Sequence, residues 1–156
     1  MDQPTVFAKW DGVDGESADT NHSKWIDVLS VDWGAHRPGG RGRGTAVCED
    51  VTLTIEYEKA SPKLMEKLLK GEIIKKLEIE VTSTYDGARA TFLKYELKNV
   101  LISSFQTSAS GGAGDRPTVV VGNNFEEIKV TYTEYGDDGK KGGNVETTWK
   151  VGKGEK

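Results

Sequence analysis

Residues 47–58 read VCEDVTLTIEYE, and they decide the character of the chain. Side chains alternate along this stretch, so that a mostly apolar side holds Val47, Glu49, Val51, Leu53, Ile55 and Tyr57. Alternation with a period of two places successive side chains on opposite faces of a β-strand. The stretch therefore predicts one half-buried strand, with Cys48 on its polar face.

The same alternation recurs along most of the chain. It is found in residues 25–33, 77–82, 92–98, 128–133 and 147–151, and shorter apolar runs cover 6–10 and 118–121. These segments predict about eight strands and a mainly β fold. In 25–33 we expect one face to hold Leu29, Val31 and Trp33 and the other to hold Val28, Ser30 and Asp32. The phase is lost near Asn99, which predicts a β-bulge there.

One segment follows a helical period instead. Ser61 is a suitable N-cap and Pro62 suits the first helical position, while Gly71 can end the helix in a left-handed conformation. Between them lies an apolar stripe of Leu64, Met65, Leu68 and Leu69. We therefore expect one α-helix over roughly 61–70 that flanks the sheet.

Length and composition limit the class of protein. The chain has 156 residues, which suits one domain, and we expect 1–156 to be a single domain. Only 35% of the residues are hydrophobic, and no run approaches the roughly 20 apolar residues of a membrane-spanning helix. The opening MDQPTVFAKWDG lacks the features of a cleaved signal peptide. A net charge of -4 argues against nucleic acid and anionic membranes as partners.

Residues that could support catalysis are few. The chain holds two histidines, His22 and His36, and one cysteine, Cys48. No motif places a histidine beside a nucleophile, and these residues are too few for a protein-built zinc site. We expect a solvated His22, a loop His36, and neither enzymatic activity nor a metal or cofactor. A surface paired with lysines is expected for the strand carboxylates Glu56, Glu58, Glu78 and Glu80, with a glycosidase pair as the open alternative.

A long glycine-rich loop lies between two predicted strands. Residues 34–45 read GAHRPGGRGRGT and carry Arg37, Arg41 and Arg43. Loops of this length inside a domain tend to be functional or mobile, and the arginine fork matches carboxylate or phosphate. Three interpretations compete: contact with the acidic surface of a second copy, a solvated loop, and binding of nucleic acid. The negative net charge favours the first.

The order of several motifs resembles the haemolysin-coregulated protein (Hcp) family over nearly the whole chain. The matching segments are 15–17 (GES), His22, 25–29 (WIDVL), 33–34 (WG), the strand and helix of 51–71, 98–102 (KNVLI), 115–116 (DR) and 125–132. The resemblance implies a compact β-barrel with one flanking helix. It also implies a structural protein of the bacterial type VI secretion system, whose hexameric rings stack into the inner tube of a contractile machine.

For this chain the resemblance implies a homohexamer in stacked rings, with type VI sheath, spike and effector proteins as further partners and effectors carried in the lumen. It implies residence in the bacterial cytoplasm before firing, then secretion without a cleaved signal peptide. The corresponding interface loop contains His36, Arg37, Gly39, Gly40, Arg41 and Arg43. Because the polar side of a small barrel must face water, a neighbour or a lumen, Ser30 and Asp32 are the candidate lumen-facing pair. The alternative function is a monomeric ligand-binding β-barrel whose Arg-Gly loop binds an acidic ligand.

Overall fold

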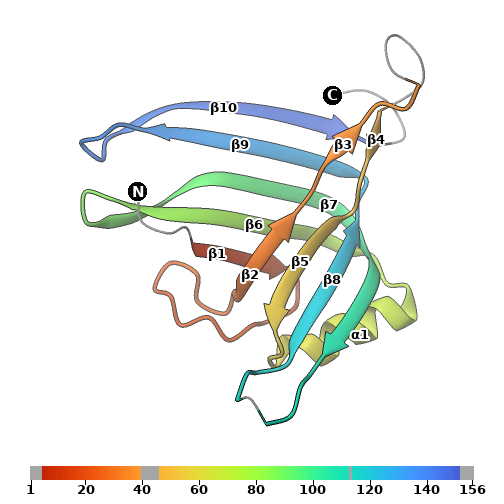
Figure 1. Cartoon of the computed structure of the whole chain (residues 1–156). Coiled ribbons are helices and arrows are strands. Elements are labelled where there is room, and N and C mark those ends of the chain that lie inside the picture. Colours follow the sequence, from red (N-terminus) through yellow and green to blue (C-terminus); the bar gives the residue numbers. More distant parts are fainter. Residues whose placement is uncertain (1–4, 40–45, 113, 152–156) are drawn as a thin grey trace.

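The computed structural model describes residues 5–39, 46–112 and 114–151, which form ten strands and one helix (Figure 1). The strands are β1 Thr5–Trp10, β2 Ile26–Asp32, β3 Ala35–His36, β4 Val47–Cys48, β5 Val51–Glu56, β6 Ile74–Tyr85, β7 Ala88–Ser108, β8 Thr118–Asn124, β9 Glu127–Tyr135 and β10 Lys141–Lys150. The helix, α1, is Ala60–Lys70. The predicted mainly β fold with one flanking helix is confirmed.

Six strands close into a barrel. They follow the order β7-β6-β1-β2-β5-β8, and β8 pairs back with β7, every pair being antiparallel. The strands β9 and β10 extend the sheet outward from the first half of β7. Closure removes most of the free edges of the barrel strands. Among the described strands of this sheet, β10 is the one that has no partner along one whole side.

Strand β7 makes this arrangement possible because it changes partner along its length. Its 21 residues pair with β9 as far as Lys98 and with β8 from Leu101 onward. Asn99 lies between these two parts with a φ of 53°, a left-handed conformation that asparagine tolerates better than most residues. The pairing with β8 also shifts register between Ile102 and Ser104. The irregularity predicted near Asn99 is thus present.

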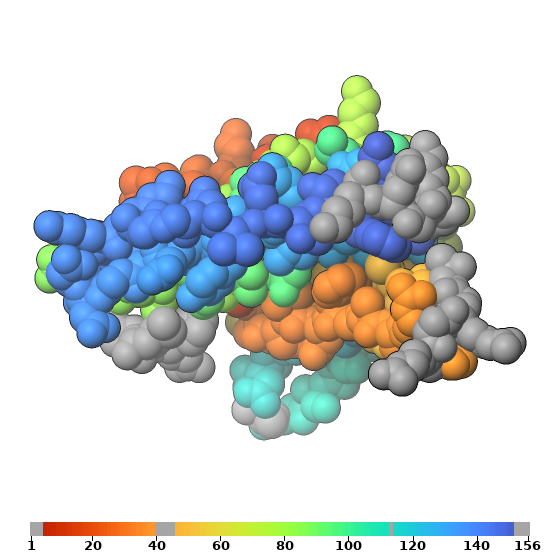
Figure 2. Space-filling model, turned by 90° about the horizontal axis from the view of Figure 1, so that it is seen from above, coloured from red at the N-terminus to blue at the C-terminus, as the bar shows by residue number. Residues whose placement is uncertain are grey.

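The hairpins β6–β7 and β9–β10 project together beyond the barrel (Figure 1). Near their turns, the rings of Tyr85 and Tyr135 stack with centroids 4.4 Å apart. Seen from above, the β9–β10 hairpin runs along the molecule from one end to the other (Figure 2). The molecule is therefore a closed barrel with a four-stranded extension on one side.

The interior of the barrel is filled by side chains. Each barrel strand contributes fully buried residues, among them Ala8, Ile26, Leu53, Ile79, Leu97 and Val121. One polar pair lies in this core: the indole N–H of Trp10 donates to Asn123 Oδ1 at 2.9 Å, and Asn123 Nδ2 donates to the carbonyl of Val51 at 3.0 Å. These partners remove the cost of burying unsatisfied polar groups.

Helix α1 begins one residue earlier than predicted. It starts at Ala60, so Ser61 lies buried in the first turn rather than at the N-cap position. The hydroxyl of Ser61 accepts the N–H of Glu58 at 3.1 Å. The N-cap role predicted for Ser61 is wrong, because its hydroxyl is turned back toward the preceding residues and not toward the N–H groups of the helix.

The other end of α1 confirms the prediction for Gly71. This glycine has a φ of 63°, and its N–H donates to the carbonyl of Leu68 as the helix ends. Leu64 is fully buried and Leu68 packs on the core, but Met65 and Leu69 are 41% and 72% exposed. The helix therefore buries a narrower stripe than the one predicted.

Residues 47–58 form two strands, not the single strand predicted. Strand β4 ends at Cys48 and pairs with β3, and β5 begins at Val51. The break at residues 49–50 reverses the phase, so Val47 is 41% exposed while Cys48 packs partly buried against the core. The prediction that Cys48 lies on the polar face is therefore wrong.

Candidate functional site

Four neighbouring segments, β2, β5, β8 and the second half of β7, present an outer surface of short polar side chains. Their inward residues, such as Leu53 and Val121, fill the core, so the alternate residues face outward. We define this hydroxyl face by Ser30, Asp32, Thr52, Thr54, Glu56, Ser104, Gln106, Ser108, Thr118, Val120 and Gly122. Most of these residues carry a hydroxyl group, and the two charged ones, Asp32 and Glu56, stand at its border.

The register places these residues in rows across the strands. One row consists of Ser30, Thr54, Val120 and Gln106, and the next consists of Asp32, Thr52, Gly122 and Ser104. Glycine is needed in the second row, since a Cβ on Gly122 would lie 2.3 Å from Ser104 Oγ. The strands of this face therefore carry side chains that are short but closely packed.

A bulge decides which residues of β2 reach the hydroxyl face. The pairing with β5 shifts register between Val28 and Ser30, which leaves Leu29 as an extra residue that is 56% exposed. The predicted faces of this strand are wrong for Val28, which is buried, and for Leu29, because alternation does not show where an extra residue is inserted. Ser30 and Asp32 are both exposed and stand in neighbouring rows of the face.

The described part of the Arg-Gly loop, residues 34–39, lies at one end of the hydroxyl face. The short strands β3 and β4 form a ribbon that follows β2 and precedes β5, and it projects beyond the barrel (Figure 1). We call this ribbon, together with the loop that joins its strands, the arm. Three of the predicted interface residues, His36, Arg37 and Gly39, are exposed on it. The other three, Gly40, Arg41 and Arg43, lie outside the described residues. His36 Nδ1 is 3.8 Å from a carboxylate oxygen of Glu49.

The opposite end of β2 and β5 carries an acidic pocket of about 150 Å³. It is lined by Glu16, Asp27, Leu29, Glu56, Glu58 and Arg116. Arg116 Nε lies 3.4 Å from Glu56 Oε2. Burial raises the pKa of Glu58, against the two backbone N–H groups that it accepts. The same pair of strands thus carries a basic arm at one end and a group of carboxylates at the other.

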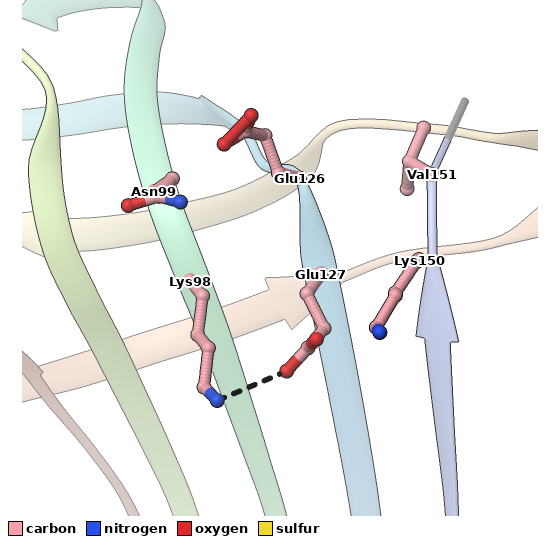
Figure 3. A pocket seen from close by; sticks show the side chains of 6 residues that line it. All are labelled: Lys98, Asn99, Glu126, Glu127, Lys150 and Val151. Carbon is pink, nitrogen blue, oxygen red and sulfur yellow. Dashed lines mark ion pairs between the residues drawn. The ribbon is translucent and has the colours of Figure 1, made fainter. Parts of the chain in front are cut away.

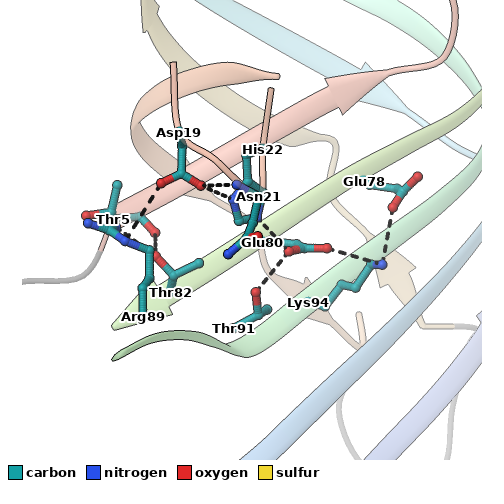
Figure 4. Close-up of polar contacts among 10 residues, drawn as sticks. All are labelled: Thr5, Asp19, Asn21, His22, Glu78, Glu80, Thr82, Arg89, Thr91 and Lys94. Atoms are coloured by element: carbon teal, nitrogen blue, oxygen red, sulfur yellow. Dashed lines mark hydrogen bonds and ion pairs between the residues drawn. The ribbon is translucent and has the colours of Figure 1, made fainter. Parts of the chain in front are cut away.

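A second outer surface, on β6, β7 and β9, has a different composition. We define this charged face by Lys76, Glu78, Glu80, Lys94, Glu96, Lys98, Glu127 and Lys129. Lys94 Nζ lies 3.2 Å from Glu78 and 3.3 Å from Glu80 (Figure 4). The predicted pairing of strand carboxylates with lysines is confirmed for these two glutamates.

A polar pocket of about 220 Å³ opens where β7 leaves β9 (Figure 3). At its edge Lys98 Nζ lies 3.2 Å from Glu127 Oε2 across the two strands. The N–H of Glu126 donates to the carbonyl of Lys98, and the N–H of Val151 donates to the carbonyl of Glu126. These bonds satisfy backbone groups where β7 stops pairing with β9. The pocket is therefore a consequence of the two strands separating.

The residues considered for catalysis do not form a common site. His22 is only 5% exposed, with Nδ1 2.7 Å from Asp19 Oδ2 and Nε2 2.8 Å from Glu80 Oε1 (Figure 4). The prediction of a solvated His22 is wrong, because β6 supplies a carboxylate from 58 residues away that no local pattern reveals. Burial raises the pKa of the Cys48 thiol, which disfavours the nucleophilic thiolate.

Metal binding and membrane spanning are the two remaining properties of the described residues. Within 5–39, 46–112 and 114–151, no group of three or more His, Cys, Asp and Glu side chains is arranged to hold a metal ion. None of the helical residues described forms a segment long and apolar enough to span a membrane.

Ser30 and Asp32 could be selected from the sequence, but the surface to which they belong could not. The alternation of Thr52 and Thr54 with buried residues, and of Ser104 and Gln106 on another strand, is visible in the sequence. That these strands belong to one surface is not visible, because it depends on β8 pairing with β5 on one side and with β7 on the other. The hydroxyl face is thus a consequence of topology.

The chain is similar to proteins of one secretion system. Residues 7–132 match the family described as "Type VI secretion system effector, Hcp". Over 155 residues the chain is 34% identical to the protein hcp1 of Pseudomonas aeruginosa, with 94% of each chain covered. A solved structure of a type six secretion system protein matches with a TM-score of 0.92 at 29% identity, covering 98% of this chain and 99% of the other. Hcp1 from Salmonella typhimurium shares the fold, with a TM-score of 0.83 at 22% identity over 97% of both chains.

Proposed function

The chain belongs to the Hcp family of type VI secretion system proteins, and from this premise we propose that it is a structural subunit of the inner tube of that system. In this proposal six copies form a ring, and rings stack into a conduit whose lumen carries effector proteins. The role is mechanical, since the subunits enclose a passage and no bond is made or broken.

The hydroxyl face is the observation that carries this proposal. A wall along which other proteins move should offer few charges and few large apolar patches, because both would retain cargo. The hydroxyl face has this composition across four adjacent strand segments, whereas the charged face does not. We therefore assign the hydroxyl face to the lumen, with Ser30 and Asp32 as lumen-facing residues.

The unpaired edge of β10 supports contact between neighbouring subunits. Strand β10 has ten residues and is exposed along most of its length. An unpaired edge offers backbone N–H and C=O groups to another chain. A contact between this edge and a different surface of the next copy is head-to-tail, and such contacts close into rings when the rotation permits.

The opposite charges at the two ends of β2 and β5 support stacking of rings. We propose that the arm contacts a neighbouring copy through its interface residues His36, Arg37, Gly39, Gly40, Arg41 and Arg43. The carboxylates of the acidic pocket, among them Glu56 and Glu58, supply a complementary surface on the neighbour. A contact between exposed charges of this kind weakens as salt is added.

The remaining assignments follow from the family and are part of the same proposal. Type VI sheath, spike and effector proteins are the further partners, and the protein resides in the bacterial cytoplasm before it is secreted. In the alternative, a monomeric ligand-binding barrel, the Arg-Gly loop and not the interior would hold the acidic ligand, because apolar side chains such as Leu53, Ile79 and Leu97 fill the barrel interior.

Native mass spectrometry and negative-stain images of the purified protein test this proposal. We expect a species of about 102 kDa, six times the 17.0 kDa of the chain, and six-fold rings in the images. A single 17.0 kDa species under all salt conditions would contradict the proposal and support the monomeric alternative. The triple variant R37A/R41A/R43A should keep the ring mass but form fewer stacks at low salt, and equal stacking would contradict the role of the arm.

A further inference from the structure

His22 belongs to a cluster that the proposed function does not use. It comes from the loop of residues 11–25, which joins β1 to β2, and it lies against both β1 and β6 (Figure 4). Its ring stacks on Phe7 with centroids 4.2 Å apart and meets Trp25 edge-on at 4.9 Å. Only 6% of the His22 side chain is exposed, so water contributes little to satisfying its nitrogens.

Both nitrogens of the ring face a carboxylate. Nδ1 faces a carboxylate oxygen of Asp19 at 2.7 Å, and Nε2 faces one of Glu80 at 2.8 Å. An ionised carboxylate only accepts hydrogen bonds, and a neutral imidazole has one N–H and one acceptor nitrogen. A neutral ring would set acceptor against acceptor at one of the two contacts. Only the imidazolium, with two N–H donors, satisfies both.

Charged groups from two other strands, β7 and β10, surround this cluster. Arg89 Nε of β7 is 4.0 Å from Asp19 Oδ1, Lys94 of the same strand pairs with Glu80 at 3.3 Å, and Lys141 of β10 lines the adjoining cavity. The hydrogen bond from His22 lowers the pKa of Asp19. Burial raises the pKa of Glu80, but hydrogen bonds from His22 and Thr91 and the charge of Lys94 outweigh burial. The pKa of Glu80 is therefore lowered overall. Both carboxylates therefore stay ionised at neutral pH, and the ring carries the proton that alters the cluster.

We propose that His22 is a pH-responsive latch that holds the loop of residues 11–25 on β6. While the ring is protonated it joins Asp19 of the loop to Glu80 of the strand. When the ring loses its proton, one contact becomes repulsive and the loop is released. The latch needs only one copy of the chain, so its test does not depend on ring formation.

Release of the loop would reach two other parts of the molecule. The cavity of about 360 Å³ that His22, Glu80 and Arg89 line would open further toward solvent. At its other end the loop is tied to the start of α1, because Glu16 accepts the N–H of Lys59 at 2.6 Å and its own N–H donates to Glu58 at 3.2 Å. The latch therefore connects the charged face to the acidic pocket at the end of the hydroxyl face.

Nitrogen-15 NMR of the two imidazole rings across about pH 5 to pH 10 tests the latch. His36, whose side chain is 57% exposed, is the internal reference. We expect both His22 nitrogens to be N–H donors while the loop is closed. When His22 does lose its proton, the amides of Gly15 and Ser17 should exchange at least about tenfold faster, because their bonds to the loop carbonyls depend on its closure. A neutral His22 ring in the closed loop, or exchange that does not change with pH, would overturn the proposal.

Two variants separate a latch from a merely structural histidine. In Glu80→Gln the amide can donate to a neutral ring, so the loop should stay protected while the pH-dependent step in exchange disappears. His22→Gln removes the titrating group, and the loop should exchange fast at every pH. The matched control His36→Gln should leave both the loop and its pH dependence unchanged. A pH step that persists in Glu80→Gln would also overturn the proposal.

Discussion

The hydroxyl face and the charged face are outer sides of one barrel, yet they differ in almost every property. Both are backed by the same core, in which Leu53, Ile79 and Leu97 are fully buried. Exposed ion pairs contribute only about 0 to 1 kcal/mol each, so neither composition is demanded by stability. The buried side of each strand thus determines the fold. The residue composition of the outer side is then determined by what that side contacts.

Strand β7 shows how sharp the boundary is, because it belongs to both faces. Before Asn99 its outward residues include Lys94 and Glu96, which pair with side chains of β6. After Asn99 they are Ser104 and Gln106, which stand beside β8. The composition changes where the partner strand changes. A single strand therefore serves two surfaces, and the positive φ of Asn99 marks the division between them.

The largest effect is expected at the packed centre of the hydroxyl face. Gly122→Ala should lower the free energy of unfolding by about 2 kcal/mol, because the new Cβ would lie 2.3 Å from Ser104 Oγ and 3.1 Å from Ser103 Oγ. Denaturant unfolding of the variant measures this loss. On the other side of the molecule, Gly143→Ala in β10 is the control, since nothing lies within 4 Å of its added Cβ.

The double variant Gly122→Ala with Ser104→Gly identifies the cause of that loss. Removing the Ser104 hydroxymethyl group makes room for the new methyl group, so most of the stability lost in the single variant should return. If Gly122→Ala and Gly143→Ala were equally stable, the close packing assigned to the hydroxyl face would be incorrect. The faces would then differ in charge only.

Much of the fold could be predicted because alternation reports burial directly. The pattern around Leu77 and Ile79 is confirmed, as is the helix end at Gly71. The failures in assigning strand faces have one physical cause. An extra residue at Leu29 and a break after Cys48 each reverse the phase, and alternation alone does not locate such an insertion.

The candidate site was less predictable because its parts meet through topology. Ser30 and Asp32 could be selected as outward residues of one strand, but their neighbours Thr52 and Thr54 are known only from the register of β2 with β5. The His22 cluster depends in the same way on β6, which brings Glu80 to a loop far from it in sequence. The residue types could be read from the sequence, but the distances between these residues in the folded chain could not.

Acidification should change the free energy of unfolding by less than Gly122→Ala does, and the direction of the change should differ between the two faces. The bond from His22 lowers the pKa of Asp19, and the net pKa of Glu80 is lowered too. A carboxylate with a folded-state pKa below its unfolded value stabilises the fold above the unfolded pKa, and this contribution is lost as the pH falls through the folded pKa. We therefore expect the free energy of unfolding to fall below about pH 4, the ordinary carboxylate range. Glu80→Gln should lower the free energy of unfolding by about 1 kcal/mol at neutral pH. It should also reduce the further loss of stability below about pH 4, which is the acid limb of the stability curve.

Glu58, at the end of the hydroxyl face, should change stability in the opposite direction when the pH falls. Its pKa is raised by burial, so the folded state binds its proton more readily than the unfolded state does. Acidification through that range therefore adds stability at Glu58 while it removes stability at Asp19 and Glu80. Glu58→Gln should make the acid limb steeper. Equal acid limbs in Glu58→Gln and Glu80→Gln would show that the two faces do not respond differently to protons.

The smallest effect on unfolding is expected where a single charge is added to each face. Thr54→Lys on the hydroxyl face and Thr131→Lys on the charged face should each change the free energy of unfolding by less than about 0.5 kcal/mol, because both positions are partly exposed on strands whose cores are unaltered. Denaturant unfolding measures both values. In a ring, however, Thr54→Lys would bring six copies of the charge to one passage, while Thr131 lies beside Lys94 and Glu146 in a surface that is already charged. Secretion of effectors in a type VI secretion assay should therefore fall for Thr54→Lys and not for Thr131→Lys. Equal secretion by the two variants would mean that the hydroxyl face does not line the passage, even if the rings themselves form.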